Sequence, residues 1–251
     1  MRSLENIKLI YICIFCVHIS CGQTEINYSD KLLTSSFKTY EAADIEMSDH
    51  ILPFLKKRFI EELENPNSFN NPYDSLSKHV SIKHSKDRLL KLYCFIERNY
   101  GCRWLSSTFV QFKTMSGDIK TVAFDEIATG IDEDLYITDL QQIEINNQSH
   151  YLVIGIGGHC GNHKYATARV YKILNDTMVL CDAIFGNESE INANSNRSRE
   201  IEMKYDIEAK TLSYNEYVFD DHYGFYSDEK SIKTWSLKKK GFRLVTDEIK
   251  K

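Results

Sequence analysis

The sequence has only three prolines and 11 glycines among its 251 residues. These residue types mark turns and the linkers between domains, so their scarcity argues against a chain of several linked domains. The one stretch that is dense in Asn and Pro spans residues 65–75 (NPNSFNNPYDS). The simplest organisation is therefore one large domain with a helical segment in front of it.

Positive charge is not in excess, because the formal net charge is −5. Proteins that bind nucleic acid use basic surface against the phosphate backbone, so we expect no nucleic-acid partner. Hydrophobic residues make up 42% and charged residues 27% of the chain. This composition is typical of a folded globular protein rather than a disordered one.

Long apolar runs are missing beyond the N-terminus. There, Arg2 and Lys8 precede an uncharged apolar run over residues 9–19, and the short segment 20–22 (SCG) follows. The run is too short for a membrane-spanning helix, which needs about 20 residues. The order of charge, apolar run and small residues predicts a cleaved secretory signal peptide over residues 1–20.

Two cleavage positions remain open at the end of this signal. Cleavage after Gly22 would release a soluble secreted protein, whereas cleavage before Cys21 would make that cysteine the new N-terminus. Residues 18–21 (HISC) resemble a bacterial lipoprotein lipobox, and the chain is similar to cell-envelope lipoproteins of Bacteroidetes. The resemblance implies lipidation of Cys21 and a membrane anchor at the outer membrane or in the periplasm, where two or three acyl chains hold a domain stably.

A second resemblance concerns residues 86–113. This segment reads KDRLLKLYCFIERNYGCRW and then STFVQFK, which is similar to a pattern in uncharacterised secreted proteins of Bacteroidetes. The resemblance implies export and a β fold, and it implies no reaction.

The chain after the signal divides into three parts. Residues 21–33 lack a clear period and are predicted to form a tether. Residues 34–66 have apolar residues at helical spacing, with Pro53 predicting a break and a second helix that starts between residues 48 and 53. Residues 79–246 change to period two and are predicted to form an antiparallel β domain.

The predicted fold class is mainly β, an antiparallel meander of sandwich, barrel or propeller-like form, preceded by a helical segment. Residues 89–96 also suit a helix. The predicted strands cover residues 79–83, 89–96, 108–113, 120–124, 135–138, 142–145, 151–156, 166–174, 178–185, 201–207, 211–219, 232–237 and 242–246.

Four cysteines besides Cys21 follow the signal, an even number that favours disulfides in an exported protein. We expect Cys94 to pair with Cys102, because the intervening residues contain a turn at 99–101. Cys160 and Cys181 are expected to remain free or buried thiols, because a meander would separate them along the strand axis by more than a disulfide allows.

The densest cluster of candidate site residues is 155–163 (GIGGHCGNH). It lacks the following helix of a nucleotide-binding loop, so no nucleotide cofactor is predicted. A glycine-rich hairpin turn with positive φ angles or close backbone approaches is the leading interpretation. The alternatives are a metal site from His159, Cys160 and His163, completed by Asp221 or His222, and a nucleophile–base pair of Cys160 with His163.

A second candidate is the acidic and aromatic loop 220–229. Its carboxylates and aromatic rings are the groups that hold or hydrolyse a sugar, provided that two carboxyl groups face each other at roughly 5–10 Å. A solvated loop is the alternative. The residues concerned are Asp220, Asp221, His222, Tyr223, Phe225, Tyr226, Asp228 and Glu229.

No motif in the chain specifies a chemistry. The leading hypothesis is an exported, lipid-anchored envelope protein that acts as a non-catalytic binding or structural module, in contact with a glycan or an envelope protein and without a cofactor. The runner-up is a hydrolase or metal-dependent enzyme that uses the 155–163 turn or the 220–229 loop.

Overall fold

The computed structural model describes residues 28–98, 101–127, 135–222 and 224–250. Strands take up 51% and helices 22% of them, the sheets are antiparallel, and no sheet closes into a barrel. The predicted fold class, mainly antiparallel β after a helical segment, is confirmed, and the barrel alternative is excluded. The chain divides into two units, Met1–His79 and Val80–Lys251.

The first unit is helical. Residues 28–42 form a helix, and α2 (Ile45–Leu63), η1 (Pro66–Asn70) and η2 (Leu76–Lys78) follow. Asp44 caps α2 by accepting a hydrogen bond from the backbone N–H of Met47. The apolar faces of the two long helices meet at Phe37 and Phe59, whose rings pack edge to face with centroids 5.8 Å apart.

The predicted tether over residues 21–33 is wrong from residue 28 onwards, because residues 28–33 already belong to the first helix. Leu33 is fully buried, and the carboxylate of Asp30 accepts hydrogen bonds from the backbone N–H groups of Ser75 and Leu76. Local sequence pattern did not reveal the order of residues 28–33, because the partners of Asp30 lie 45 and 46 residues further along the chain.

The predicted break at Pro53 is also wrong, because α2 runs through this residue without interruption. The break between the two helices lies at residues 43–44, directly before the cap. Proline has no N–H, so one backbone carbonyl in the preceding turn of the helix lacks its helical hydrogen bond. Pro53 is exposed, so water can bond to this carbonyl instead.

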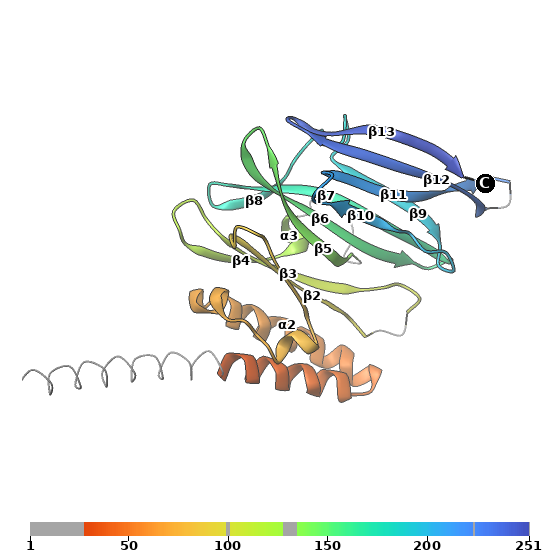
Figure 1. Ribbon diagram of the computed structural model, residues 1–251. Coiled ribbons are helices and arrows are strands. Elements are labelled where there is room, and N and C mark those ends of the chain that lie inside the picture. Colours follow the sequence, from red (N-terminus) through yellow and green to blue (C-terminus); the bar gives the residue numbers. More distant parts are fainter. Residues whose placement is uncertain (1–27, 99–100, 128–134, 223, 251) are drawn as a thin grey trace, which may run out of the picture. The chain divides into compact units, whose positions relative to one another are not determined.

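In the residues that the structure describes, the second unit contains three antiparallel sheets (Figure 1). Sheet A has the order β1 (Ser81–His84), β2 (Leu90–Ile96), β3 (Ser106–Lys113) and β4 (Ile119–Ala123), and the short helix α3 (Phe124–Ile127) follows. Sheet B has the order β5 (Tyr136–Ile145), β6 (Gln148–His159), β7 (His163–Leu174) and β8 (Thr177–Leu180), and β9 (Glu190–Asn196) also pairs with β7. Sheet C has the order β10 (Met203–Asp206), β11 (Thr211–Asp220), β12 (Phe225–Lys238) and β13 (Gly241–Lys250).

Sheet B is the middle layer, and alternate residues of its strands serve two different cores. In β6, Leu152 and Ile154 pack into a cluster with side chains of sheet C, whereas Tyr151 and Val153 pack into a cluster with side chains of sheet A. All four are buried. This double burial explains why β6 is continuously apolar, since a strand covered on both faces has no solvent face.

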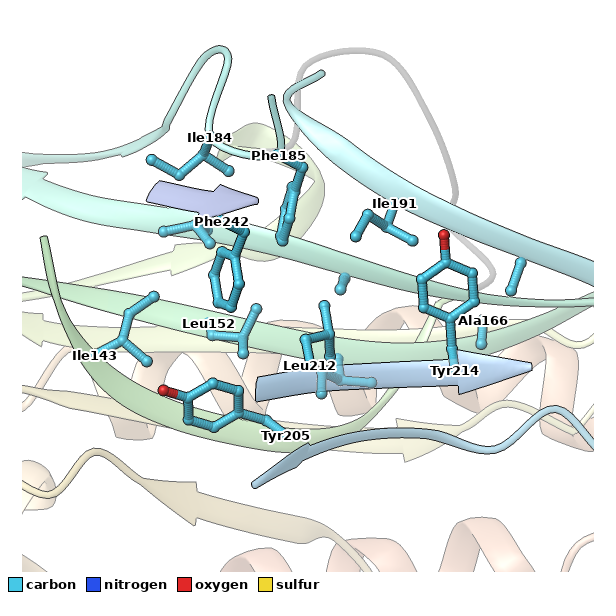
Figure 2. Packing of buried hydrophobic residues seen from close by; sticks show 14 of the residues in the cluster. Ile143, Leu152, Ala166, Ile184, Phe185, Ile191, Tyr205, Leu212, Tyr214 and Phe242 are labelled. Atoms are coloured by element: carbon cyan, nitrogen blue, oxygen red, sulfur yellow. The ribbon is translucent and has the colours of Figure 1, made fainter. Parts of the chain in front are cut away.

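Figure 2 shows the cluster between sheets B and C. Phe185, from the connection between β8 and β9, stacks on Phe242 of β13 with ring centroids 4.9 Å apart. Tyr205 on β10 packs edge to face against the same Phe242 ring, with centroids 6.1 Å apart. These aromatic contacts join segments from both sheets at one point in the core.

Two differences from the predicted strands affect the sheet. β9 was not predicted, because its sequence EINANSN is polar, yet Ile191, Ala193 and Ser195 are buried in alternation. The predicted strands 135–138 and 142–145 are one strand, β5, with a register shift between Ile137 and Asp139. A β-bulge inserts a residue into a continuous strand, and it interrupts the alternation that marks the strand in the sequence.

None of the helices in the described part of the chain combines the length and the apolarity that crossing a bilayer requires.

Candidate functional site

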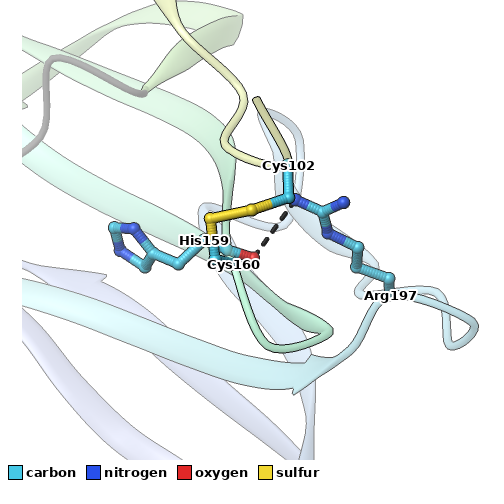
Figure 3. Close-up of a disulfide and its surroundings, with 4 residues drawn as sticks. All are labelled: Cys102, His159, Cys160 and Arg197. Carbon is cyan, nitrogen blue, oxygen red and sulfur yellow. Dashed lines mark hydrogen bonds between the residues drawn. A yellow bond between two sulfur atoms is a disulfide. The ribbon is translucent and has the colours of Figure 1, made fainter. Parts of the chain in front are cut away.

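A disulfide joins Cys102, in the connection between β2 and β3, to Cys160, in the turn between β6 and β7 (Figure 3). The Cα atoms are 5.1 Å apart, although 58 residues separate the two cysteines in the sequence. The predicted pair of Cys94 with Cys102 is therefore wrong, as is the expectation that Cys160 is a free thiol. Cys181 is free and buried, as expected.

Cys94 does not pair because its side chain points into the core between sheets A and B. It lies opposite Thr108 in the β2–β3 register, and its sulfur accepts hydrogen bonds from the Thr108 hydroxyl at 3.0 Å and the Ile137 N–H at 3.4 Å. Burial raises the pKa of the Cys94 thiol, which keeps it protonated and unreactive at neutral pH.

The 155–163 segment is strand rather than loop over most of its length, because β6 extends to His159 and β7 begins at His163. The glycines within β6 have ordinary strand φ angles, and among the four glycines of the segment only Gly161 has a positive one, at 81°. The other part of the prediction, close approach, does hold: a Cβ at Gly157 would overlap the ring of Tyr165.

The structure does not assemble the proposed metal site. Cys160 has no thiolate to offer, since its sulfur is bonded to Cys102. His159 stacks on Tyr165 with centroids 5.1 Å apart, and His163 meets the edge of Tyr226 at 6.0 Å. Across residues 28–98, 101–127, 135–222 and 224–250, no three His, Cys, Asp or Glu side chains lie together as metal ligands would. The same disulfide rules out Cys160 as a nucleophile paired with His163.

The 220–229 segment is the tip of the β11–β12 hairpin, with Phe219 opposite Tyr226 and Asp220 opposite Phe225. Tyr223 lies outside the described residues. Asp228 forms an ion pair with Arg199 at 2.7 Å, and the Asp220 side chain accepts a hydrogen bond from the His222 N–H. These carboxylates therefore serve local contacts around an exposed hairpin tip.

The two candidate segments of the sequence come together through aromatic contacts. His163, at the start of β7, meets Tyr226 of β12, and Tyr226 in turn meets Phe219 of β11 with centroids 5.0 Å apart. The side-chain amide of Asn196, opposite His163 in the register, donates a hydrogen bond to the Tyr226 carbonyl at 3.2 Å. The end of sheet B is thereby fastened to the hairpin of sheet C.

The same surface continues across Arg197 to Trp104. The guanidinium of Arg197 lies over the Trp104 ring at 5.6 Å. It also donates a hydrogen bond to the carbonyl of His159 at 3.1 Å (Figure 3). The backbone N–H of Trp104 donates to the carbonyl of Gly158 at 3.0 Å. Trp104 therefore lies directly against β6, two residues beyond the disulfide.

We call the five residues Trp104, His163, Arg197, Phe219 and Tyr226 the aromatic platform. Trp104 is 38% and Phe219 is 42% exposed. Large aromatic side chains are normally buried, so several exposed together mark a surface that another molecule can cover. Burial raises the pKa of Tyr226, so its phenol stays protonated and can donate a hydrogen bond.

Trp104 and Arg197 were not singled out from the sequence. Trp104 is one of only two tryptophans, and it follows Cys102 closely, but its neighbours on the platform come from strands that begin about 60 residues later or more. Arg197 directly follows the polar strand β9, which the sequence pattern did not reveal. The disulfide and the layering of the sheets bring these two residues to the end of β6, where they bond to the carbonyls of Gly158 and His159.

Lys91, a group with a strongly lowered pKa, lies on β2 and outside the platform. Burial lowers the pKa of Lys91 on β2 from 10.5 to about 8. Its Nζ lies over the ring of Tyr93 at 5.1 Å. Neither residue belongs to the platform.

The chain matches no protein-family model, and it has no significant sequence similarity to a curated protein. Cys21, the candidate lipidation site, lies outside the described residues.

Proposed function

We propose that the protein is an exported, lipid-anchored binding module without catalytic activity, and that the aromatic platform is its contact surface for a glycan chain. The observation that carries the proposal is the group of exposed aromatic side chains fastened by the Cys102–Cys160 disulfide. Disulfides persist mainly outside the cytosol, which supports the export that residues 1–20 predict.

The chemistry of the platform supports a sugar ligand. The face of a pyranose ring carries C–H groups that pack against an aromatic ring, while its hydroxyl groups need donors and acceptors at the edge. Trp104 and Phe219 offer the exposed rings, and Arg197 and Tyr226 lie beside them with donor groups.

Preorganisation supports binding as well. The disulfide and the hydrogen bond from Trp104 to Gly158 hold the tryptophan in place before a ligand arrives. A surface that is ordered in advance loses less conformational entropy on binding, which leaves more of the contact energy as affinity.

The hydrolase hypothesis has less support. A glycosidase needs two carboxyl groups that face each other across the scissile bond. Near the hairpin tip, Asp228 is paired with Arg199, and its side chain is 98% exposed. Binding without cleavage is therefore the function that we propose for this surface.

The test is binding of the purified mature protein to an array of bacterial polysaccharides, together with the variants W104A and F219A. Each variant is expected to lose at least about 1 kcal/mol of binding free energy, since aromatic side chains that the ligand buries carry much of the energy of a binding surface. The matched control is F54A, because Phe54 is 74% exposed on α2, away from the platform residues in the sequence. Unchanged binding by W104A, or equal losses for W104A and F54A, would contradict the proposal, as would release of shortened glycan.

A further inference from the structure

A groove of about 670 Å³ lies beside β10, the edge strand of sheet C. One wall is formed by the segment that leads into β10, and the floor includes Ile154 and Ile156 of β6 in the middle sheet. None of the platform residues lines this groove. Its volume lies within the range of roughly 300–1,000 Å³ that is usual for small-molecule sites.

The inner surface of the groove is apolar and continues the core. Ile154, Ile201 and Tyr214 are members of the cluster between sheets B and C, and Ile156 and Met203 pack against that cluster while remaining partly exposed. An alkyl chain laid on this floor would extend the packing of the core and remove apolar surface from water.

The rim of the groove is charged. Lys164, Lys204 and Lys230 come from three different strands, and Glu200 and Glu202 lie at the entry to β10. Within the described part of the chain, none of these five side chains takes part in an ion pair. Three ammonium groups beside two carboxylates leave a small excess of positive charge at the rim.

The wall of the groove is held in place by Asn215 of β11. Its side-chain oxygen accepts a hydrogen bond from the Glu202 N–H at 2.6 Å, and its amide donates to the Glu200 carbonyl at 3.0 Å. The segment that carries both glutamates is therefore fixed by two hydrogen bonds to Asn215, and the groove exists before a ligand enters.

From this arrangement we infer that the groove binds an amphiphile with one anionic head group, its alkyl part on the isoleucine floor and its head at the lysines of the rim. The apolar floor requires an alkyl segment, and the unpaired lysines favour a carboxylate, phosphate or sulfate head. The rim disfavours a polyanion, because a single negative charge neutralises its small positive excess and each further charge meets net repulsion from the two glutamates.

The ligand test compares three twelve-carbon probes that differ in their head groups: dodecanoate, dodecyl maltoside and dodecylamine. Each probe is titrated calorimetrically into the purified mature protein at neutral pH, at concentrations below the critical micelle concentration of the probe. Dodecanoate is expected to bind most tightly and dodecylamine most weakly. Shortening the carboxylate probe should weaken binding by about fourfold for each methylene that lies on the floor.

Two variants test the rim, one that removes a positive charge and one that removes a negative charge. K204A should weaken dodecanoate binding about threefold to fivefold, and E202Q should strengthen it by a similar factor, as expected for single exposed charges. For dodecylamine both effects should reverse. The control K113A removes an exposed lysine of β3 in sheet A, which does not line the groove, and should leave all affinities unchanged.

The result that would overturn the inference is absence of binding, or equal affinity for dodecanoate and dodecylamine. A change of dodecanoate affinity in the same direction for K204A and E202Q would also overturn the inference. Loss of structure would weaken binding in both variants, whereas a charged rim requires the two variants to change the affinity in opposite directions. Acetate and inorganic phosphate, titrated alone, should bind much more weakly than dodecanoate, and comparable binding would show that the alkyl floor is not used.

Discussion

Cys102 and Cys160 lie 58 residues apart in the sequence, and their Cα atoms are 5.1 Å apart in the structure. Their disulfide fastens the connection between β2 and β3 to the end of β6, which belongs to the next sheet. Because Trp104 lies two residues beyond Cys102, the bond also fixes one end of the aromatic platform.

The first prediction concerns this bond. The double variant C102S/C160S should lower the free energy of unfolding by about 2–4 kcal/mol, because it frees a long loop in the unfolded chain. It should also weaken glycan binding, since Trp104 loses its anchor. Chemical denaturation and the polysaccharide array measure the two effects.

Reduction provides the control for this prediction. Dithiothreitol should destabilise the wild type and leave C102S/C160S unchanged. Peptide mapping without reduction should find Cys102 linked to Cys160 in the wild type and in C94S alike. A peptide that links Cys94 to Cys102 would contradict the structure.

The second prediction concerns Gly157, where an added Cβ would overlap the ring of Tyr165. Because the ring is buried in the core between sheets A and B, it cannot move away freely. G157A should therefore lower the free energy of unfolding by about 1–3 kcal/mol, measured by urea denaturation.

A double-mutant cycle separates this steric effect from backbone effects. In the Y165A background the ring is absent, so the further change G157A should cost little, and the coupling between the two positions should be large. Equal costs of G157A in both backgrounds would exclude the contact with Tyr165 as the cause.

The third prediction follows from Lys91, which is fully buried and has a pKa of about 8 instead of 10.5. Between these values the unfolded chain holds a proton that the folded protein has released, so rising pH favours the folded state. Relative to K91M, the wild type should gain about 2 kcal/mol of unfolding free energy between pH 8 and pH 10.

The comparison with K91M cancels the contributions of tyrosines and cysteines that titrate in the same range. K113M, at an exposed position of β3, is the matched control and should differ from the wild type by the same amount at both pH values. A constant difference between K91M and the wild type would mean that Lys91 is charged in the folded protein throughout this range.

The fourth prediction concerns the anchor. If Cys21 carries lipid, the wild type should partition into the detergent phase and C21A into the aqueous phase after membrane fractionation. Aqueous partitioning of both would exclude lipidation and leave cleavage after Gly22 as the alternative.

The local pattern of the chain predicted most of the strands, because alternation of side chains is a property of each strand by itself. Met203 and Tyr205 alternate with Lys204 and Asp206, and this segment is strand β10. The pattern failed where a strand departs from simple alternation. It failed at the bulge of β5 and at β9, whose buried positions include only small or polar residues besides Ile191.

The cysteine pairing and the platform were decided by the tertiary structure. Four cysteines allow three pairings, and the turn after Cys94 favoured the wrong one, since local spacing does not reveal that Cys94 faces the core. The contact between the 155–163 turn and the 220–229 hairpin depends on the packing of sheet C against sheet B. The sequence by itself indicated a chain reversal within each segment, whereas only the packing of sheet C against sheet B brought His163 and Tyr226 together. Contacts between distant segments follow from burial of shared apolar faces and not from local periodicity.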